Sequence, residues 1–327
     1  MSLIGGKFRL HPTDERIFFD EKGCPEKQRI PHSYYFDGKR CECSVTEFMS
    51  RFVGKFNKKR KIKEILNHRY RNSIYSTMTE TEIGDLWDVA GVDGSELHHR
   101  IDKFYDSDVI FSDKQHKLYV DFEKFLRFHE NLLSQHYDIF QSEYIVTQAI
   151  GNTQIGGLID MNAKNSRNED KLVVDWKRCA NPNVQTRQKL DKIVYVRYAV
   201  RDQTERGKAF LVMPSGFAKS DVVDEVDHLV DPAKPSSISV VRTASNPLIG
   251  RTFSKHLKNS LQLNIYAHIL RQSYCDGSSA FFGTSKHFKL VNVYFSHRYD
   301  SYLEKECLDL QAEVGKMFEL AENGFFD

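Results

Sequence analysis

The stretch Lys171-Leu-Val-Val-Asp175-Trp-Lys177 is an apolar run that ends on an acid, a tryptophan and a lysine. A run of this length, rich in β-branched residues and closing near turn-forming residues, predicts a β-strand. Alternate side chains of an extended strand point to the same face, so Asp175 and Lys177 should project together, with Val174 and Trp176 on the opposite face. The stretch therefore predicts a strand that presents a carboxylate beside an amine.

A second apolar run, Gly157-Leu-Ile-Asp160, precedes the first and also ends on an acid. If the two runs form neighbouring strands, Asp160 joins Asp175 and Lys177. Two carboxylates supply the hard oxygen ligands that Mg²⁺ or Mn²⁺ prefers, and an amine can orient an attacking water. Such a trio suits phosphodiester hydrolysis. An Asp at a strand end is also a common turn residue, so the pair alone leaves a structural role open.

The hydrophobic pattern around these runs alternates between strand and helix periods. We expect a hairpin in the first 43 residues with its turn at Asp37-Gly38, then a helix capped by Ser44 with Glu47 completing a capping box. Further helices are expected over 78–106, 121–135, 253–271 and 302–321, and further strands over 143–150, 154–163 and 288–295. This order predicts an α/β fold in which helices flank a mixed central β-sheet.

The charge balance is nearly neutral, with a formal net charge of +2 over 327 residues. No overall basic field therefore indicates a polyanionic partner, but basic residues cluster over 57–63. The candidate nucleic-acid contacts in this cluster, with a solvated helix face as the alternative, are Lys58, Lys59, Arg60 and Lys61. The aromatic residues nearby that can stack on unpaired bases are Phe52, Phe56, Tyr70 and Tyr75. The helical spacing of Phe48, Phe52 and Phe56 is equally typical of a buried stripe.

The six cysteines are scattered and form no C-x-x-C pair. This pattern favours free thiols in a reducing, intracellular compartment. No apolar run reaches the length of a membrane span, and the N-terminus lacks a signal-peptide core, so we expect no membrane association. The nucleus, the cytoplasm and a virus- or phage-infected cell all meet these conditions, as does a mitochondrion if a presequence has been removed.

Three further groups of residues carry chemistry on the expected elements. His98 lies one helical turn beyond Gly94, a glycine that would let the backbone approach closely there. Glu143 opens a strand, and Gln262 and Tyr266 lie four apart and so share a helix face. Each group also has a purely structural interpretation: a satisfied histidine, an exposed charge at a strand end, and the polar flank of an apolar stripe.

Taken in chain order, these motifs resemble the PD-(D/E)xK nuclease superfamily, and specifically its RecB-like branch. The four motifs that match are Gly94 to His98, Gly157 to Asp160, Asp175 to Lys177 and Gln262 to Tyr266. Each motif is weak alone, but four in order on the expected element types are specific. Ser44-Val-Thr46 before a helix, together with Val174 to Lys177, is also similar to the mitochondrial genome maintenance exonucleases and related viral and phage nucleases.

The resemblance implies a restriction-endonuclease-like core and a metal-dependent DNA nuclease, with exonuclease action on single-stranded DNA or DNA ends expected. A Mg²⁺- or Mn²⁺-activated water would hydrolyse the phosphodiester bond and leave 5′-phosphate and 3′-hydroxyl ends. The implied metal ligands are His98, Asp160, Asp175 and the backbone carbonyl of Trp176. RNA as the substrate is left open.

The remaining roles are also carried over from the resemblance. Lys177 would position the attacking water, and Gln262 would orient Lys177 or contact the scissile strand. Tyr266 would lie near the phosphate, and Glu143 would be an additional acid. Arg178 follows the lysine where the family usually has threonine or serine, and it is a further candidate nucleic-acid contact. Many members of the branch hold an iron-sulfur cluster with four cysteines, but here Cys307 stands alone, so we expect no cluster.

The expected organisation is an N-terminal hairpin and basic helical region over 1–83, followed by the nuclease core over 84–327. An insertion over 180–253 interrupts the core, and its basic residues would grip a nucleic-acid strand or a protein partner. Two alternatives stay open. One is a catalytically inactive nucleic-acid-binding module on the same fold. The other is an interaction protein in which the motifs are coincidental.

Overall fold

The computed structural model describes most of the chain. The described residues are 8–10, 17–21, 32–54, 56–68, 74–151, 153–179, 185–189, 193–200, 238–249, 251–275, 287–297 and 299–323. Tyr70, one of the aromatic residues proposed to stack on bases, lies outside them.

The described part of the chain contains six helices. They are α1 (Val45–Val53), α2 (Lys58–His68), α3 (Glu80–Ser107), α4 (Tyr119–Ser134), α5 (Lys255–Cys275) and α6 (Gln311–Glu322). The strands up to the acidic motifs are β1 (Phe8–Leu10), β2 (Ile17–Glu21), β3 (His32–Phe36), β4 (Lys39–Arg40), β5 (Cys43–Ser44), β6 (Tyr137–Ile150), β7 (Thr153–Asn165) and β8 (Lys171–Arg178). Those that follow are β9 (Gln185–Lys189), β10 (Ile193–Val200), β11 (Ile238–Ser245), β12 (Thr252–Ser254), β13 (Phe288–Phe295) and β14 (Leu303–Glu306).

The central sheet has six strands in the order β14, β13, β8, β7 and β5, with β6 also paired to β7. β8 runs parallel to β13 and antiparallel to β7, and β5 runs parallel to β7. The two acidic motifs therefore lie on adjacent strands, as the sequence predicts. The mixed α/β fold class is confirmed.

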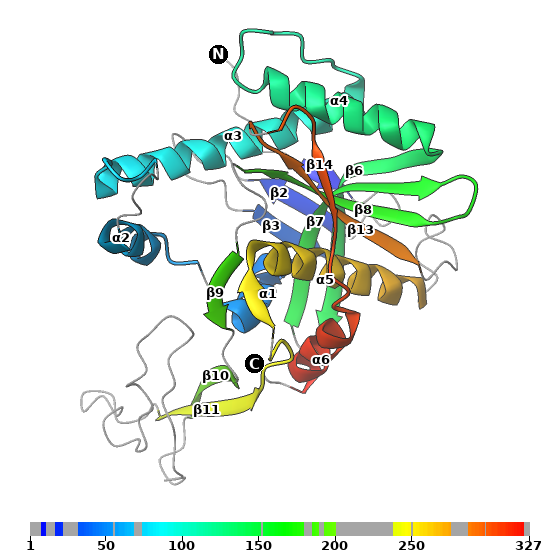
Figure 1. Ribbon diagram of the computed structural model, residues 1–327. Coiled ribbons are helices and arrows are strands. Elements are labelled where there is room, and N and C mark those ends of the chain that lie inside the picture. The colour runs from blue at the N-terminus through cyan, green and yellow to red at the C-terminus, as the bar shows by residue number, and fades with distance from the viewer. Residues whose placement is uncertain are drawn as a thin grey trace.

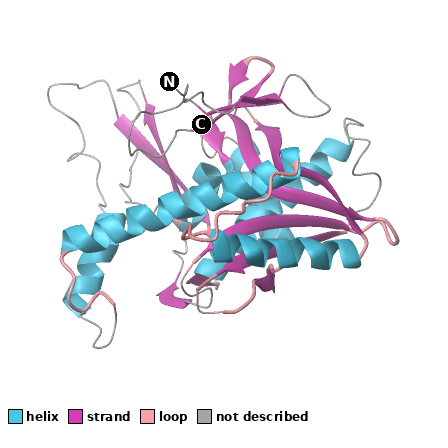
Figure 2. Cartoon of the chain, turned by 90° about the horizontal axis from the view of Figure 1, so that it is seen from above, coloured by secondary structure: helices cyan, strands magenta, loops and turns pink. Residues whose placement is uncertain are grey.

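Helices cover both faces of this sheet (Figures 1 and 2). α1, α5 and α6 form one hydrophobic core with one face, and α3 and α4 form a second core with the other. Trp176 and Val174 belong to the second core, as expected from strand alternation. In Figure 1, α5 crosses the sheet on one side, while α3 reaches outward with α2 near its N-terminal end.

The turn at Asp37-Gly38 joins β3 and β4, and both residues have positive φ. Ser44 caps α1 and forms the predicted capping box with Glu47. Phe48 and Phe52 are buried, which confirms their part of the aromatic stripe. Phe56 was expected in the same stripe, but it follows the end of α1 and is 64% exposed, so that prediction is wrong.

The helix expected over 302–321 is shorter than predicted. Residues Leu303–Glu306 form β14 and pair with β13, so α6 begins only at Gln311. The pairing with a buried neighbour, which a periodicity argument cannot foresee, decides the local structure here.

A smaller sheet of β1 to β4 packs against the central one. β2 contacts β6, and β3 contacts β7. Tyr34, Phe36 and Leu158 surround the buried Ile145 at this junction. The N-terminal hairpin region thus lies directly against the strand that carries Asp160.

Candidate active site

The DxK strand is anchored through its tryptophan. The Trp176 ring makes edge contacts with Phe125 and Phe128 of α4, with ring centroids 5.8 and 5.4 Å apart. Aromatic pairs at such distances add to the burial of the rings and fix their orientation. Because Trp176 is held on one face of β8, its neighbours Asp175 and Lys177 are directed to the other.

Asp160 lies where β7 and β8 separate. The last paired residues of the two strands are Met161 and Val174, and beyond them the backbone N–H of Trp176 donates to Asp160 Oδ2 at 2.7 Å. Burial alone would raise the pKa of Asp160, but the charges of His98 and Lys177 and the Trp176 hydrogen bond hold it below its usual value. Asp160 is therefore a carboxylate fixed beside the DxK motif.

Asp175 and Lys177 face the same side of β8 and form an ion pair, with Lys177 Nζ 2.6 Å from Asp175 Oδ1. Burial raises the pKa of Asp175 to about 6, although Lys177 opposes that shift. Burial would lower the pKa of Lys177, but Asp175 and Asp160 raise it above its ordinary value. Asp160, Asp175 and Lys177 thus form one electrostatically linked group, as expected from the two strands.

His98 reaches this group from α3. Its Nε2 donates to the carbonyl oxygen of Trp176 at 3.0 Å, and its Nδ1 lies 3.6 Å from Asp160 Oδ2. Burial would lower the pKa of His98, yet the negative charge of Asp160 raises it overall. The histidine therefore contacts two of the groups that were expected to be its fellow metal ligands.

Gly94 does not play the part expected of it. A Cβ added there would meet no atom within 4 Å, so no close backbone approach requires this glycine. That interpretation is wrong, because Gly94 lies within the continuous helix α3, where its face is open.

Gly157 is the glycine that a close approach requires. A Cβ there would lie 2.5 Å from Tyr266 Cε1 and 2.8 Å from Val45 Cγ2. The Tyr266 ring therefore packs against the bare backbone of β7, three residues before Asp160. Gln262 Nε2 lies 3.3 Å from the Tyr266 hydroxyl, so the two residues meet on α5 as their spacing predicts. Burial raises the pKa of Tyr266, and Asp160 and Asp175 add to that rise.

Glu143 lies on β6 between two residues that pair with β7: Ser142 pairs with Met161, and Tyr144 pairs with Ile159. It thus lies opposite Asp160 across the β6–β7 ladder, with a φ of 51°. A positive φ at a residue other than glycine redirects the side chain and is uncommon in a strand. The charge of Glu143 helps to raise the pKa of His98. Its part as an additional acid stays a prediction.

The donor atoms present suit a hard divalent cation. Among the described residues, the buried Asp175 Oδ2 has no hydrogen-bond partner, and a second carboxylate, Asp160, lies on the next strand. No three His, Cys, Asp or Glu side chains of the described residues are close enough to hold an ion by themselves. Mg²⁺ commonly uses only one or two carboxylates and completes its shell with water and phosphate. The carboxylates therefore fit such an ion, whereas His98 would first have to release the Trp176 carbonyl.

The basic segment forms α2, and its charges are partly neutralised. Lys58 Nζ pairs with Asp88 at 2.7 Å, while Arg60 and Lys61 pair with Glu64 at 3.3 and 2.9 Å. Lys59 is exposed. Nucleic-acid contact by these residues stays a prediction.

Arg178 has partners that the sequence analysis did not identify. Its Nε lies 2.7 Å from Asp121 of α4, and its Nη1 lies 3.2 Å from Asp93 of α3. Both acids are buried. Arg178 therefore ties β8 to the two helices of one layer, and its expected contact with nucleic acid is not tested. Helix periodicity alone gave no signal that these two acids point inward.

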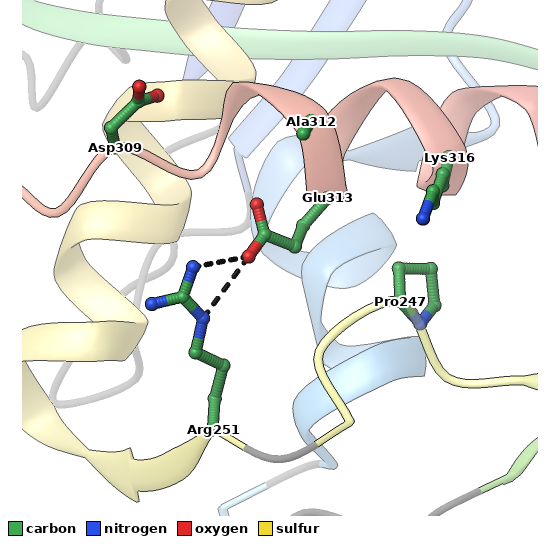
Figure 3. Close-up of a pocket in the computed structure, with 6 residues that line it drawn as sticks. All are labelled: Pro247, Arg251, Asp309, Ala312, Glu313 and Lys316. Carbon is green, nitrogen blue, oxygen red and sulfur yellow. Dashed lines mark hydrogen bonds and ion pairs between the residues drawn. The ribbon is translucent and has the colours of Figure 1, made fainter.

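A surface hollow of about 420 Å³ lies elsewhere, and its lining residues are Pro247, Arg251, Asp309, Ala312, Glu313 and Lys316 (Figure 3). Arg251 Nε pairs with Glu313 at 3.1 Å. None of the motif residues lines this hollow, so it is separate from the acids of β7 and β8.

The similarities of this chain to known proteins are distant. No protein-family model matches the chain, and no curated protein matches it. Among solved structures, the protein SSO0001 is similar at 12% identity, with 85% of this chain and 73% of that one covered and a TM-score of 0.30. A Eubacterium rectale protein described as a "putative exonuclease" is similar at 13% identity, with 87% of this chain and 82% of that one covered and a TM-score of 0.35.

No described helix combines the length and the apolar character of a membrane span.

Proposed function

We propose that this chain is a divalent-metal-dependent nuclease that hydrolyses phosphodiester bonds in DNA. The observation that supports this most is the meeting of Asp160, Asp175 and Lys177 where β7 and β8 part. A buried carboxylate oxygen without a partner and an adjacent second carboxylate suit Mg²⁺ or Mn²⁺. This agrees with the resemblance of the four motifs to the RecB-like branch of the PD-(D/E)xK nucleases.

A bound cation would supply electrophilic assistance to the phosphate and lower the pKa of a water molecule. Asp160 and Asp175 would hold it, and the Trp176 carbonyl is a further donor at the same point. Lys177 keeps its proton, because its pKa is raised, and so it is a cation that orients the attacking water and offsets negative charge. The amide of Gln262 and the hydroxyl of Tyr266, both on α5, are uncharged hydrogen-bond donors available to the substrate.

A catalytically inactive nucleic-acid-binding module is the second candidate. It is favoured by two contacts that already occupy groups of the site: His98 donates to the Trp176 carbonyl, and Lys177 donates to Asp175 Oδ1. Retention of two acids beside a polyanion argues against it, because they repel phosphate unless a cation is present.

One assay separates these candidates. End-labelled single-stranded and duplex DNA are incubated with the parent, with Lys177→Ala and with the surface control Asp138→Ala, in Mg²⁺, Mn²⁺ or EDTA. The proposal expects metal-dependent products from the parent and the control but not from Lys177→Ala. DNA that is bound but stays intact in every metal would support the inactive module instead. The same labelled products reveal strand preference and end polarity.

A further inference from the structure

An exposed aromatic ring packs on α3 beside the start of the basic helix α2. The Phe56 side chain is 64% exposed, and its ring lies against that of Trp87, with the centroids 5.9 Å apart and the planes inclined at 40°. Trp87 is half-buried and is held in place, because its Nε1 donates to the Tyr75 hydroxyl at 3.1 Å. Phe56 is therefore an aromatic surface that is backed by a fixed neighbour and is still largely open to solvent.

Unpaired cations follow this ring closely along the chain. Phe56 leads into α2, where Lys59 and Lys63 lie four residues apart and so share a helix face. Both lysines are exposed, and neither forms an ion pair with any residue that the structure describes. Exposed aromatic rings combined with such cations are what proteins use to hold unpaired bases together with the phosphates that join them.

The aromatic pair and the candidate active site lie along one face of α3. This helix is continuous over Glu80–Ser107 and extends beyond the sheet (Figure 1). His98 follows Trp87 by eleven residues, or about three turns, so the two residues lie within about 20° of each other around the helix axis. The distance between them along the axis is about 16 Å. Because His98 contacts the Trp176 carbonyl, a straight path along α3 joins the aromatic pair to the acids.

The residues along this path are small and uncharged. Ala90 is exposed at its edge, and Gly94 lies between Trp87 and His98 on the same face, where an added Cβ would meet no atom within 4 Å. The acids of residues 85–96 lie about 100° or more from Trp87 around the axis. They are Asp85, Asp88, Asp93 and Glu96, of which the last three form ion pairs with Lys58, Arg178 and Arg100. A polyanion on this face would therefore meet no carboxylate of α3 between Trp87 and His98.

We propose that Phe56 and Trp87 form a nucleobase subsite, on which an unpaired base stacks while its strand runs along α3 to the acids. The unpaired lysines of α2 favour a polyanion over another apolar surface as the occupant. A stacked strand rises about 3.4 Å per nucleotide, so the subsite lies roughly five nucleotides or fewer from the bond that is cut. A base inside a duplex has no free face for the ring, so the subsite selects unpaired strands. This inference rests on the proposed function and adds a substrate-binding subsite to it.

The test compares Phe56→Leu with Val89→Ala. Phe56→Leu keeps an apolar side chain but removes the ring, and Phe56→Tyr restores a ring. Val89 is the matched control, because it is an exposed apolar residue of α3 that lies about 160° from Trp87 around the axis. Each variant is titrated in Ca²⁺ with an oligothymidine and with an abasic strand of the same length. Cleavage kinetics in Mn²⁺, the melting temperature and the oligomeric state are also measured.

We expect Phe56→Leu to bind the oligothymidine roughly 5- to 100-fold more weakly than the parent, the usual effect of losing one stacking ring. Its KM for single-stranded DNA should rise with little change in kcat, because the ring lies away from the reacting phosphate. The parent should bind the abasic strand more weakly than the oligothymidine, and Phe56→Leu should bind the two alike. Phe56→Tyr and Val89→Ala should match the parent, and all melting temperatures should agree.

The outcomes separate this inference from the proposed function. A parent that cleaves DNA, with Phe56→Leu equal to it in binding and KM, would overturn the subsite and leave the nuclease proposal standing. A parent that binds but does not cleave in any metal, with binding weakened only in Phe56→Leu, would support the subsite and overturn the nuclease. A parent that neither binds nor cleaves would overturn both.

Three further results would also overturn the subsite. The first is equal binding of the oligothymidine and the abasic strand by the parent. The second is an equal loss of binding in Phe56→Leu and Val89→Ala with lowered melting temperatures, which would show a structural role. The third is a change of oligomeric state in Phe56→Leu with unchanged DNA binding, which would assign the ring to contacts between copies of the chain.

Discussion

The carboxylate of Asp160 accepts a hydrogen bond from the backbone N–H of Trp176 across 2.7 Å. This side-chain contact continues the link between β7 and β8 beyond Met161 and Val174, their last paired residues. It holds one acid beside the ion pair of Asp175 and Lys177. The proposed hydrolysis therefore depends on the point where β7 and β8 separate and the Asp160 carboxylate links them.

Asp160 and Asp175 should act as a unit in catalysis. We expect Asp160→Ala and Asp175→Ala each to lower the cleavage rate by about 10³-fold or more, and the double variant to lose little beyond either single one. Both acids would hold the same ion, so the first substitution already removes its effect. Single-turnover rates on labelled DNA, with the exposed Asp138→Ala as control, measure this. Either single variant cleaving at the parental rate would exclude the assignment.

Metal binding should strengthen as pH rises through about 6. Burial raises the pKa of Asp175 to about 6, so below that pH a proton occupies the carboxyl group that the ion needs. Because the pKa of Asp175 is raised, the metal-free folded protein binds more protons than the unfolded chain below pH 6. The contribution of Asp175 to the free energy of unfolding is therefore lost as pH increases toward 6. The rise in melting temperature caused by Mn²⁺ should therefore be small at pH 5 and larger at pH 7. A Mn²⁺ effect that is independent of pH would contradict this placement of Asp175.

The two motif glycines should respond in opposite ways to alanine. Gly157→Ala places a Cβ 2.5 Å from the Tyr266 ring, and we expect it to destabilise the fold by roughly 1–3 kcal/mol, the usual range for overpacking. Gly94→Ala meets open space within a helix, so it should be neutral or stabilise by up to about 1 kcal/mol. Urea unfolding of the two variants provides the comparison. Equal effects would contradict the close packing of the Tyr266 ring on Gly157.

Alanine substitutions of Arg178 and Lys59 should distinguish a residue that stabilises the fold from one that binds DNA. Arg178→Ala leaves Asp93 and Asp121 buried without this partner, and we expect a loss of roughly 2–3 kcal/mol. That is below the range for a fully buried pair, because 27% of the Arg178 side chain is exposed. Lys59→Ala should leave stability unchanged and, if α2 contacts DNA, weaken binding in a salt-dependent way. A stable Arg178→Ala variant with weak DNA binding would reverse this assignment.

The sequence predicted the parts of the site that depend on strand alternation and helix spacing. Asp175 and Lys177 share a face because side chains alternate, and Gln262 meets Tyr266 because they are one helical turn apart. The capping box of Ser44 was equally predictable, since it needs only residues three apart. Local rules were sufficient in each case.

Features that depend on tertiary pairing could not be predicted in this way. β14 replaces the start of an expected helix because it pairs with β13, and Phe56 is exposed because α1 ends before it. Tyr34 lies far from Gly156 in sequence, and only the packing of β3 on β7 brings the two residues together. The opposite roles of Gly94 and Gly157 likewise depend on what faces each backbone.

The most direct test of the central claim is to locate a bound ion. Crystals of the protein grown or soaked with Mn²⁺ are measured for anomalous scattering at the manganese edge. The account predicts one peak within coordination distance of both the Asp160 and Asp175 carboxylates, lost in Asp175→Asn. A peak bound elsewhere, or two carboxylates that face different layers with no ion between them, would contradict it.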